Sequence, residues 1–333
     1  MNPMQFTQVI PRLRVLETRL LDKAKLDRMI DASSPQEALK VLGESEYANV
    51  LSGVKRAEDY EMVLSSELKR VYELMYDASP SKALIDIMSI KYDYHNIKVL
   101  IKGMKLKKDF SEMLIPVGKI DLQTLKHSVL NNNLSDLNEN MKNGIIRANE
   151  DFDSNKDPQK IDIILDNAMF EELKTIAKGL DDKFVTKYVR VLIDLTNLKT
   201  LLRVKKQSKG KDFLSEVVIE GGFIDVDTLV SLLNDSAENI ANKLSYTDYS
   251  EILKLGMDDF SKTNSASELE KLTDNYIMKM MKEAKLIPFG VEPLLAYIYA
   301  KETEIKVVRI IMVGKLNNVT GEVIRERLRD IYV

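Results

Sequence analysis

The chain has 333 residues, of which 44% are hydrophobic and 30% charged, so it can bury a substantial core and is not a disordered protein. Its 49 Lys and Arg residues nearly balance 52 Asp and Glu residues, and a net charge of −3 argues against a nucleic-acid partner. The absence of cysteine excludes disulfides, thiolate zinc sites and a thiol nucleophile, and is typical of a reducing compartment such as the cytoplasm.

Helical spacing of apolar residues runs through the chain, beginning with Leu13 and Leu16. Ser34-Pro35-Gln36-Glu37 predicts a helix start, because serine can cap the first turn and proline fits its first position. A further apolar stripe covers 64–75, and Ser267-Glu268 predicts a later helix start. Strand-like alternation is scarce, so the sequence predicts an all-α fold.

No segment has the pattern of a signal peptide or a membrane span. The N-terminal residues Met1 to Thr7 lack the charged start and the apolar stretch of a signal peptide. The longest apolar runs, Leu294 to Ala300 and Ile310 to Val313, are much shorter than the roughly 20 residues that cross a bilayer. We therefore expect a chain that does not itself span a membrane.

Two sequence signatures recur and indicate an internal repeat. Gly118-Lys-Ile-Asp-Leu-Gln-Thr-Leu125 returns 104 residues later as Gly222-Phe-Ile-Asp-Val-Asp-Thr-Leu229. Asp93-Tyr-His-Asn96-Ile-Lys98 returns as Asp194-Leu-Thr-Asn197-Leu-Lys199 and, more loosely, as Glu304-Ile-Lys-Val307-Val-Arg309. The simplest explanation is three related helical repeats of about a hundred residues each.

A third similarity spans about twice this period. Ser34, Leu42, Tyr47 and Leu51 match Ser236, Leu244, Tyr249 and Leu253. Repeats of this length can each bury a core, so they are predicted to be three similar domains, with boundaries at 1–112, 113–216 and 217–333. Three similar domains suggest a pseudo-threefold arrangement around a central space.

The sequence contains no recognisable cradle for a nucleotide. The P-loop pattern is absent, because Gly118-Lys119 and Gly314-Lys315 are followed by Ile and Leu rather than by Ser or Thr. Only His95 and His127 could supply an imidazole for a metal site or a catalytic triad. We expect both histidines to be solvated or packed, and we predict no catalytic, cofactor-binding or metal-binding residue.

Adjacent carboxylates occur at Glu171-Glu172, Asp181-Asp182 and Asp258-Asp259. Carboxylate pairs can perform acid–base catalysis, but neighbours on a helix do not point at one target. Exposed helix faces or turns are the favoured interpretation of these pairs. A hydrolase built on carboxylates stays as a third functional hypothesis, which the loss of activity on changing one Asp or Glu would support.

The helices that carry the Asp-x-x-Asn signature continue into basic stripes. The stripe residues are Lys98, Lys102 and Lys105, then Lys199, Arg203 and Lys206, with Arg309 at the first position of the third repeat. These side chains could form a contact face for a partner. They could instead complement helix C-termini and cover apolar surface with their stems.

The C-terminal part of the chain resembles the C subunit of V-type and A-type ATPases, whose eukaryotic relative is the d subunit. The resemblance rests on 288–316, with Ala300-Lys-Glu-Thr-Glu304 at its centre, followed by Lys306 and Arg309. The closing segment 322–333 is similar to the end of prokaryotic members. Chain length and the threefold repeat agree with the family along essentially the whole sequence.

This resemblance implies a pseudo-threefold funnel of helical domains on the cytoplasmic face of a membrane rotor ring made of proteolipid subunits. A shaft formed by subunits D and F would enter the mouth of the funnel. The implied role is non-catalytic and needs no cofactor, because other subunits hydrolyse or make ATP. Val307 stands where the family usually has Asn, so the third repeat is expected to lack one polar contact.

The resemblance makes the basic stripes candidates for the wall of this socket, where complementary charge would steer assembly. A second candidate patch, formed by Arg325, Arg327 and Arg329, would face ring loops or anionic headgroups. The alternative interpretation of the patch is a solvated C-terminal helix. The alternative function is a soluble helical scaffold that binds another partner, and the sequence does not distinguish sodium from proton transport.

Overall fold

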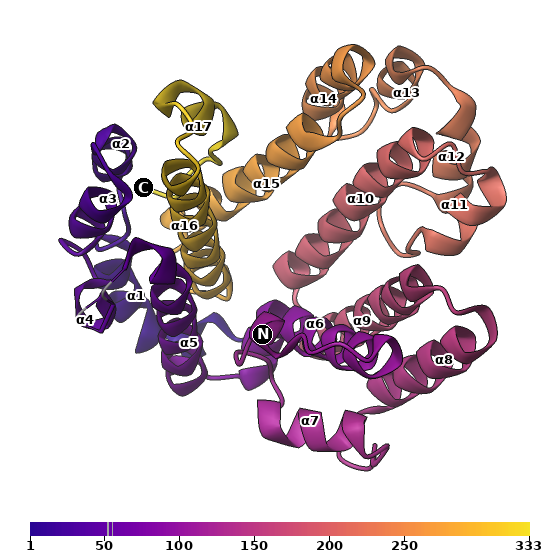
Figure 1. Ribbon diagram of the computed structural model, residues 1–333, viewed down its shortest axis with the longest axis horizontal. Helices are drawn as coiled ribbons and strands as arrows, with labels where there is room; N and C mark the ends of the chain where they lie inside the picture. Colours follow the sequence, from indigo (N-terminus) through magenta and orange to yellow (C-terminus); the bar gives the residue numbers. More distant parts are fainter. Residues whose placement is uncertain (52, 55) are drawn as a thin grey trace. The chain divides into compact units, whose positions relative to one another are not determined.

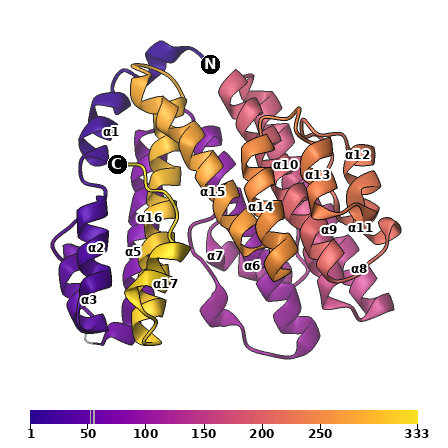
Figure 2. The ribbon, with the colours of Figure 1, turned by 90° about the horizontal axis from the view of Figure 1, so that it is seen from above.

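The computed structural model describes residues 1–51, 53–54 and 56–333 of the chain. Every regular element within these residues is a helix, which confirms the predicted all-α class. None of these helices combines the length and the apolar character that crossing a membrane requires. Figures 1 and 2 show the helices in chain order from indigo to yellow.

The chain forms two compact units. Unit 1 combines both ends of the sequence, Met1–Ile85 and Lys271–Val333, and unit 2 consists of Asp86–Glu270. The three predicted domain ranges and their funnel arrangement stay a prediction.

Unit 1 is built around one long helix, α16, which packs against α1, α2, α3 and α5. The elements that lie wholly or mostly in unit 1 are η1 (Pro3–Phe6), α1 (Val9–Glu17), α2 (Lys23–Asp31), α3 (Pro35–Leu42), α4 (Ala48–Leu51), η2 (Ala57–Asp59), α5 (Tyr60–Ala78), α15 (Ser267–Lys282), η5 (Glu283–Leu286), α16 (Glu292–Leu316) and α17 (Gly321–Arg327). Both ends of the chain therefore share one core.

Unit 2 contains two long helices of the same type, α6 and α10. Its elements are α6 (Lys82–Leu106), η3 (Ser111–Met113), α7 (Leu122–Leu130), α8 (Glu139–Asn155), α9 (Pro158–Leu180), α10 (Lys183–Lys206), α11 (Lys211–Val217), α12 (Val226–Ser231), η4 (Leu232–Asn234), α13 (Ala237–Lys243) and α14 (Ser250–Thr263). Extensive packing joins α8 to α9 and α13 to α14, and α10 also packs on α9.

Side-chain caps explain where many helices begin. The Ser34 hydroxyl accepts a hydrogen bond from the Glu37 N–H, and Pro35 occupies the first turn of α3, as the sequence predicts. The predicted start at Ser267 is also confirmed, because α15 begins there. Asp22 caps α2 and Asp121 caps α7 in the same way.

Candidate functional site

Asp93 and Asn96 on α6 hold the loop that precedes α7. The Asp93 carboxylate accepts hydrogen bonds from the backbone N–H groups of Lys119 and Ile120 at 2.8 and 3.2 Å. The Asn96 side chain donates to the Ile115 carbonyl at 2.7 Å and accepts from the Ile115 N–H at 2.8 Å. Four backbone groups of an irregular segment thus find partners on one helix face.

The same arrangement recurs on α10. The Asp194 carboxylate accepts from the N–H groups of Phe223 and Ile224 at 2.9 and 3.0 Å. Asn197 donates to the Ile219 carbonyl at 2.7 Å and accepts from its N–H at 2.9 Å. We call this pairing of a helix Asp and Asn with a following loop the helix–loop clamp.

Glycine is required in both clamped loops because the aspartate comes very close. A Cβ atom built on Gly118 would lie 1.9 Å from Asp93 Oδ1, and Gly222 meets Asp194 in the same way. The two recurring sequence signatures are therefore the two halves of the helix–loop clamp. The Asp-x-x-Asn signature supplies the acceptors, and the Gly-x-Ile-Asp signature supplies the loop.

The third copy of the clamp joins α16 to the segment that follows α1, within unit 1. Glu304 on α16 accepts from the N–H of Leu21 at 2.6 Å, as Asp93 and Asp194 accept from their loops. Val307 stands at the Asn position and, as expected, has no polar side chain to offer. In the other two clamps the residue held by Asn comes five positions before the second residue held by Asp, and the same spacing from Leu21 gives Leu16. Leu16 lies inside α1, and its carbonyl accepts from the Arg19 N–H at 3.1 Å.

The third repeat also buries a lysine, and no other lysine among the described residues is buried. Lys301 Nζ lies 2.8 Å from a carboxylate oxygen of Glu67 and 2.8 Å from one of Glu304. Tyr47 donates to Glu304 at 2.9 Å, and Arg70 donates to Glu67 at 2.7 and 2.8 Å. The three central charges are almost fully buried, and their pairing ties α16 to both α5 and the segment around Tyr47.

The pKa values in this cluster follow from burial and from opposite charges. Burial lowers the pKa of Lys301, but the nearby Glu304 and Glu67 carboxylates raise it by more than burial lowers it. The pKa therefore lies above its usual value, and the lysine stays charged. Burial raises the pKa of Glu67, but hydrogen bonds from Arg70 and the charge of Lys301 bring it below its usual value. Lys301 and Glu67 thus both favour the charged form in this buried network.

The two clamps of unit 2 differ in their electrostatics. Tyr249 donates a hydrogen bond to Asp194 at 2.8 Å, although burial still raises the pKa of that aspartate. Burial raises the pKa of Asp93 to about 7, the two loop N–H groups oppose the shift, and the Glu172 carboxylate adds to it. Glu172 itself accepts from Tyr94 at 2.9 Å.

The first basic stripe faces acidic residues of its own unit. Each of its three lysines forms an ion pair with an aspartate on α9 or α8: Lys98 with Asp166, Lys102 with Asp162 at 2.6 Å, and Lys105 with Asp153 at 2.8 Å. These pairs hold the end of α6 against its neighbours. Whether the stripe also contacts a partner stays a prediction.

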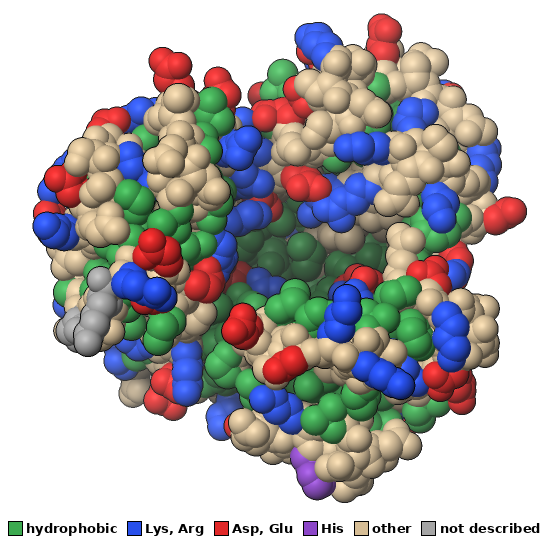
Figure 3. Space-filling view, in the orientation of Figure 1, with side chains coloured by type: hydrophobic (Ala, Val, Ile, Leu, Met, Phe, Trp, Pro, Cys, Tyr) green, Lys and Arg blue, Asp and Glu red, His purple; other side chains and the backbone are tan. Residues whose placement is uncertain are grey.

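Of the other stripe residues, Arg203 and Lys206 are exposed. Arg203 pairs with Glu270 at 2.6 Å and is 57% exposed, and Lys206 lies on the surface. Lys199 is half-buried. Arg309 donates two hydrogen bonds to the Glu61 carboxylate, at 2.5 and 2.9 Å. Figure 3 shows Lys and Arg side chains interspersed with Asp and Glu over the face that it draws.

The C-terminal arginines do not share one environment. Arg325 bridges Asp27 and Asp31 at 3.2 and 2.6 Å, which fixes α17 on α2. Arg329 is mostly covered and donates to Asp274 at 3.0 Å. Arg327 is exposed. Partner binding by this patch stays a prediction, and the structure brings Arg325 and Arg329 onto internal acids instead of presenting three free cations.

The histidines and adjacent carboxylates have ordinary surroundings. His95 Nε2 lies 2.8 Å from the Met113 carbonyl, and His127 Nδ1 lies 3.0 Å from the Asn131 side-chain nitrogen. Among the adjacent carboxylates, Glu172 is buried, but its neighbour Glu171 is exposed and pairs with Lys174. The two side chains therefore do not act on one target.

Sequence reasoning missed the contacts that join the two ends of the chain. Arg14 on α1 donates to the carbonyls of Ala284 and Ile287 at 2.9 and 2.7 Å, and to Glu17. Tyr332 donates to Glu17 at 2.9 Å. The only signal in the sequence was charge next to an apolar helix face, which does not identify a partner some 270 residues away.

Comparison with known proteins supports the relationship that the C-terminal motif indicates. The chain is 28% identical over 330 residues to the C subunit of the V-type sodium ATPase of Enterococcus hirae, covering 99% of both chains. It is also 28% identical over 342 residues to the C subunit of the A-type ATP synthase of Methanocaldococcus jannaschii, covering 97% of this chain and 86% of the relative. A third relative, the corresponding A-type ATP synthase protein of Pyrococcus abyssi, is 25% identical over 337 residues, covering 96% of this chain and 89% of the relative.

The family model described as "ATP synthase (C/AC39) subunit" matches residues 9–327. This range includes all three helix–loop clamps and the buried Lys301 network. The match therefore extends over both units and is not confined to the C-terminal motif. The chain belongs to the ATP synthase (C/AC39) subunit family.

Proposed function

We propose that the chain is a non-catalytic central-stalk component of a V-type rotary ATPase. It forms the socket that couples a shaft of subunits D and F to the membrane rotor ring, on the cytoplasmic face of the membrane. The observation that carries the proposal is the family match over residues 9–327, together with full-length relatives that are C subunits of V-type and A-type enzymes. Catalysis and ion transport are assigned to other subunits.

The mechanical part of the proposal is supported by how the loops are held. A protein that transmits torque must resist twisting, and close-packed helices do this well. Irregular segments are the weak points of such a fold, because they have few internal contacts of their own. The helix–loop clamps reduce this weakness by attaching each loop to a long helix, through four hydrogen bonds in each of the first two repeats and through the Glu304–Leu21 bond in the third.

The partner-binding part of the proposal assigns the socket wall to the exposed stripe residues Arg203 and Lys206 and to the partly exposed Arg309. Exposed charges separate and re-form contacts at low cost, because water and salt screen them. Lys98, Lys102 and Lys105 are already paired with aspartates, so a partner would have to compete for them. Charge complementarity at such faces mainly sets the rate and orientation of assembly.

The test is a pull-down of the purified chain with the D–F shaft pair and, separately, with the detergent-solubilised rotor ring of the same organism, at low and high salt. Binding to both, weakened by salt, would support the coupler. Reversal of charge in Arg203→Glu or Arg309→Glu is expected to weaken shaft binding roughly tenfold, about 1.4 kcal/mol.

Charge-swap variants separate partner contact from internal stability. Arg203→Glu with Glu270→Arg restores the internal ion pair, and Arg309→Glu with Glu61→Arg does the same in unit 1. If a partner contacts the cation, binding stays weak in the swap variants. If binding returns to normal, the cations act only within the chain and the assigned wall is wrong. Binding to neither partner would favour the alternative function, a helical scaffold for another protein.

A further inference from the structure

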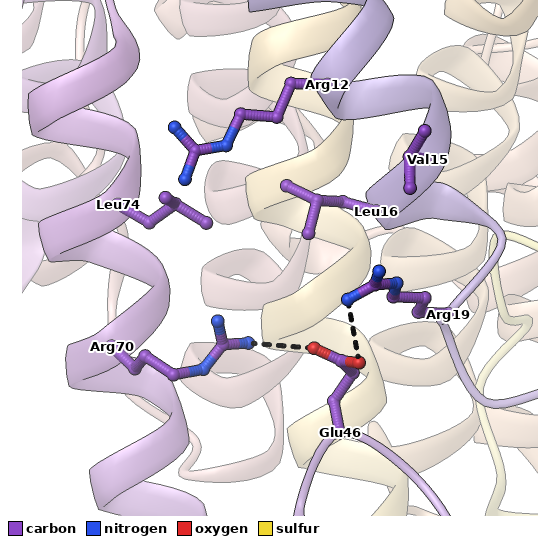
Figure 4. A pocket seen from close by; sticks show the side chains of 7 residues that line it. All are labelled: Arg12, Val15, Leu16, Arg19, Glu46, Arg70 and Leu74. Carbon is purple, nitrogen blue, oxygen red and sulfur yellow. Dashed lines mark hydrogen bonds and ion pairs between the residues drawn. The ribbon is translucent and has the colours of Figure 1, made fainter.

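A groove of about 360 Å³ opens between α1 and α5 of unit 1. Its apolar lining comes from Leu16, which is buried, Leu74, and Val15, which is 53% exposed. Figure 4 shows Leu16 and Leu74 lying between Arg12 on one side and the pair Arg19 and Arg70 on the other. An apolar strip thus has a guanidinium group on each side of it.

The groove holds more positive than negative charge. Its lining includes three arginines but one carboxylate, that of Glu46. Arg19 donates to one Glu46 oxygen at 3.3 Å, and Arg70 lies 3.9 Å from the other. Both contacts are long for charged pairs, so this carboxylate is shared loosely between two cations.

Arg12 is the unused donor. It is exposed and forms no hydrogen bond or ion pair with the described residues of the chain, although a guanidinium group has five N–H donors. Arg70 is different, because two of its donors are fixed on the buried Glu67 at 2.7 and 2.8 Å. This leaves one fixed and two adaptable arginines around the apolar strip.

We propose that this groove binds an acidic amphipathic helix of another protein chain. Glu46 already demonstrates that a carboxylate fits between Arg19 and Arg70. A helix with acidic residues on both sides of an apolar position would place its apolar side chain on Leu16 and Leu74, and its carboxylates on Arg12 and Arg19. The occupant is recognised by this pattern of acidic, apolar and acidic positions.

An anionic lipid matches the groove less well. A lipid carries its charge at one end and its apolar tails leave the headgroup in one direction, so it would engage the basic group on one side of the strip only. A peptide helix can engage both sides. The inference concerns this surface alone and does not depend on a rotary role for the chain.

The test places a photo-crosslinking residue, p-benzoylphenylalanine, at Val15 in the full-length chain in the cells that make it. After irradiation, mass spectrometry locates the attached residue. The expected product is an adduct with a protein segment that has Asp or Glu within one helical turn of the attachment point. Arg12→Glu is expected to lower the yield at least tenfold, and it removes no ion pair within the described chain.

A matched control comes from α8, where exposed Ile146 is followed by exposed Arg147. The crosslinker at Ile146 is expected to give no adduct with that segment, and Arg147→Glu is expected to leave the Val15 adduct unchanged. The proposal is overturned by a lipid adduct, by attachment to a segment without acidic residues, or by a yield at Val15 that Arg12→Glu does not change. It is also overturned if Val15 gives no more product than Ile146.

Discussion

Gly222 lies so close to Asp194 that a Cβ atom on the glycine would be 2.0 Å from the carboxylate Oδ1. Real Cβ atoms do not approach this closely, so Gly222→Ala must displace the aspartate from the N–H groups that it accepts from. We expect the free energy of unfolding to fall by about 2–4 kcal/mol, measured by urea denaturation. Gly118→Ala is expected to behave in the same way at Asp93.

The control for these variants is Gly179 near the end of α9. Apart from its chain neighbours and the backbone of its own helix, no heavy atom lies within 4 Å of the position that its Cβ would occupy. Gly179→Ala is therefore expected to stabilise the helix by about 0.5–1 kcal/mol, because alanine loses less conformational freedom on folding. Equal effects at Gly222 and Gly179 would show that the aspartate contact does not constrain the loop.

Asn197 and Val307 occupy equivalent positions, but their environments call for opposite side chains. Ile219 lies in an irregular segment and needs Asn197 for both its N–H and its carbonyl. Leu16 lies within α1, where helical hydrogen bonds use these groups. We expect Asn197→Val to cost about 2–3 kcal/mol by leaving two buried groups unpaired, and Val307→Asn to cost about 1–3 kcal/mol by burying an amide without partners.

Urea denaturation of the two variants measures both costs. The stabilities of these two variants are compared with those of Asn197→Asp, which changes the charge, and Val307→Thr, which changes the polarity. Both of these substitutions change the side-chain volume little. A Val307→Asn variant as stable as the parent chain would contradict the explanation, because it would show that the buried amide does find partners in the third repeat.

The repeat was visible in the sequence because its signatures specify a local geometry. A glycine followed two positions later by isoleucine and then by an aspartate at the start of the next helix identifies the loop, and Asp and Asn three residues apart identify one face of a helix. The completion of the third clamp was not visible. Glu304 accepts from Leu21 across 283 residues of sequence, and no local pattern indicates which distant loop a helix will hold.

The basic stripes show the complementary limit of sequence reasoning. Their spacing predicts a shared helix face, but it does not reveal the aspartates with which Lys98, Lys102 and Lys105 pair within the chain. Asp162 and Asp166 are four residues apart on α9, so they form an acidic stripe with the same spacing as Lys98 and Lys102. Matching stripes of opposite charge on two helices, α6 and α9, were the available signal for an internal contact.

The buried position of Lys301 between Glu67 and Glu304 makes the third repeat sensitive to loss of one charge. Lys301→Met is expected to lower the free energy of unfolding by about 3–5 kcal/mol, because it leaves the buried Glu304 without its cation and leaves Glu67 with Arg70 alone. Adding Glu67→Gln and Glu304→Gln to the same variant should restore part of this loss. Urea denaturation of the single and triple variants measures the difference, and no recovery in the triple variant would contradict the assignment.

The pKa of Asp93 predicts a loss of stability as the pH rises. Burial raises this pKa to about 7, whereas an unfolded aspartate titrates near 3.9, so between about pH 4 and pH 7 the folded chain holds a proton that the unfolded chain releases. The contribution is complete below pH 4 and is lost as the pH rises toward 7, by up to about 1.4 kcal/mol per pH unit. Asp93→Asn keeps an acceptor for the loop N–H groups but cannot ionise. We therefore expect its stability relative to the parent chain to increase from pH 4 to pH 7 in urea unfolding measured across that range.

Asp227→Asn, on an exposed position of α12, is the control and should show no such trend. A parent chain whose stability rises over this window in step with Asp93→Asn would mean that Asp93 is ionised throughout and that its clamp is held by a carboxylate of ordinary acidity.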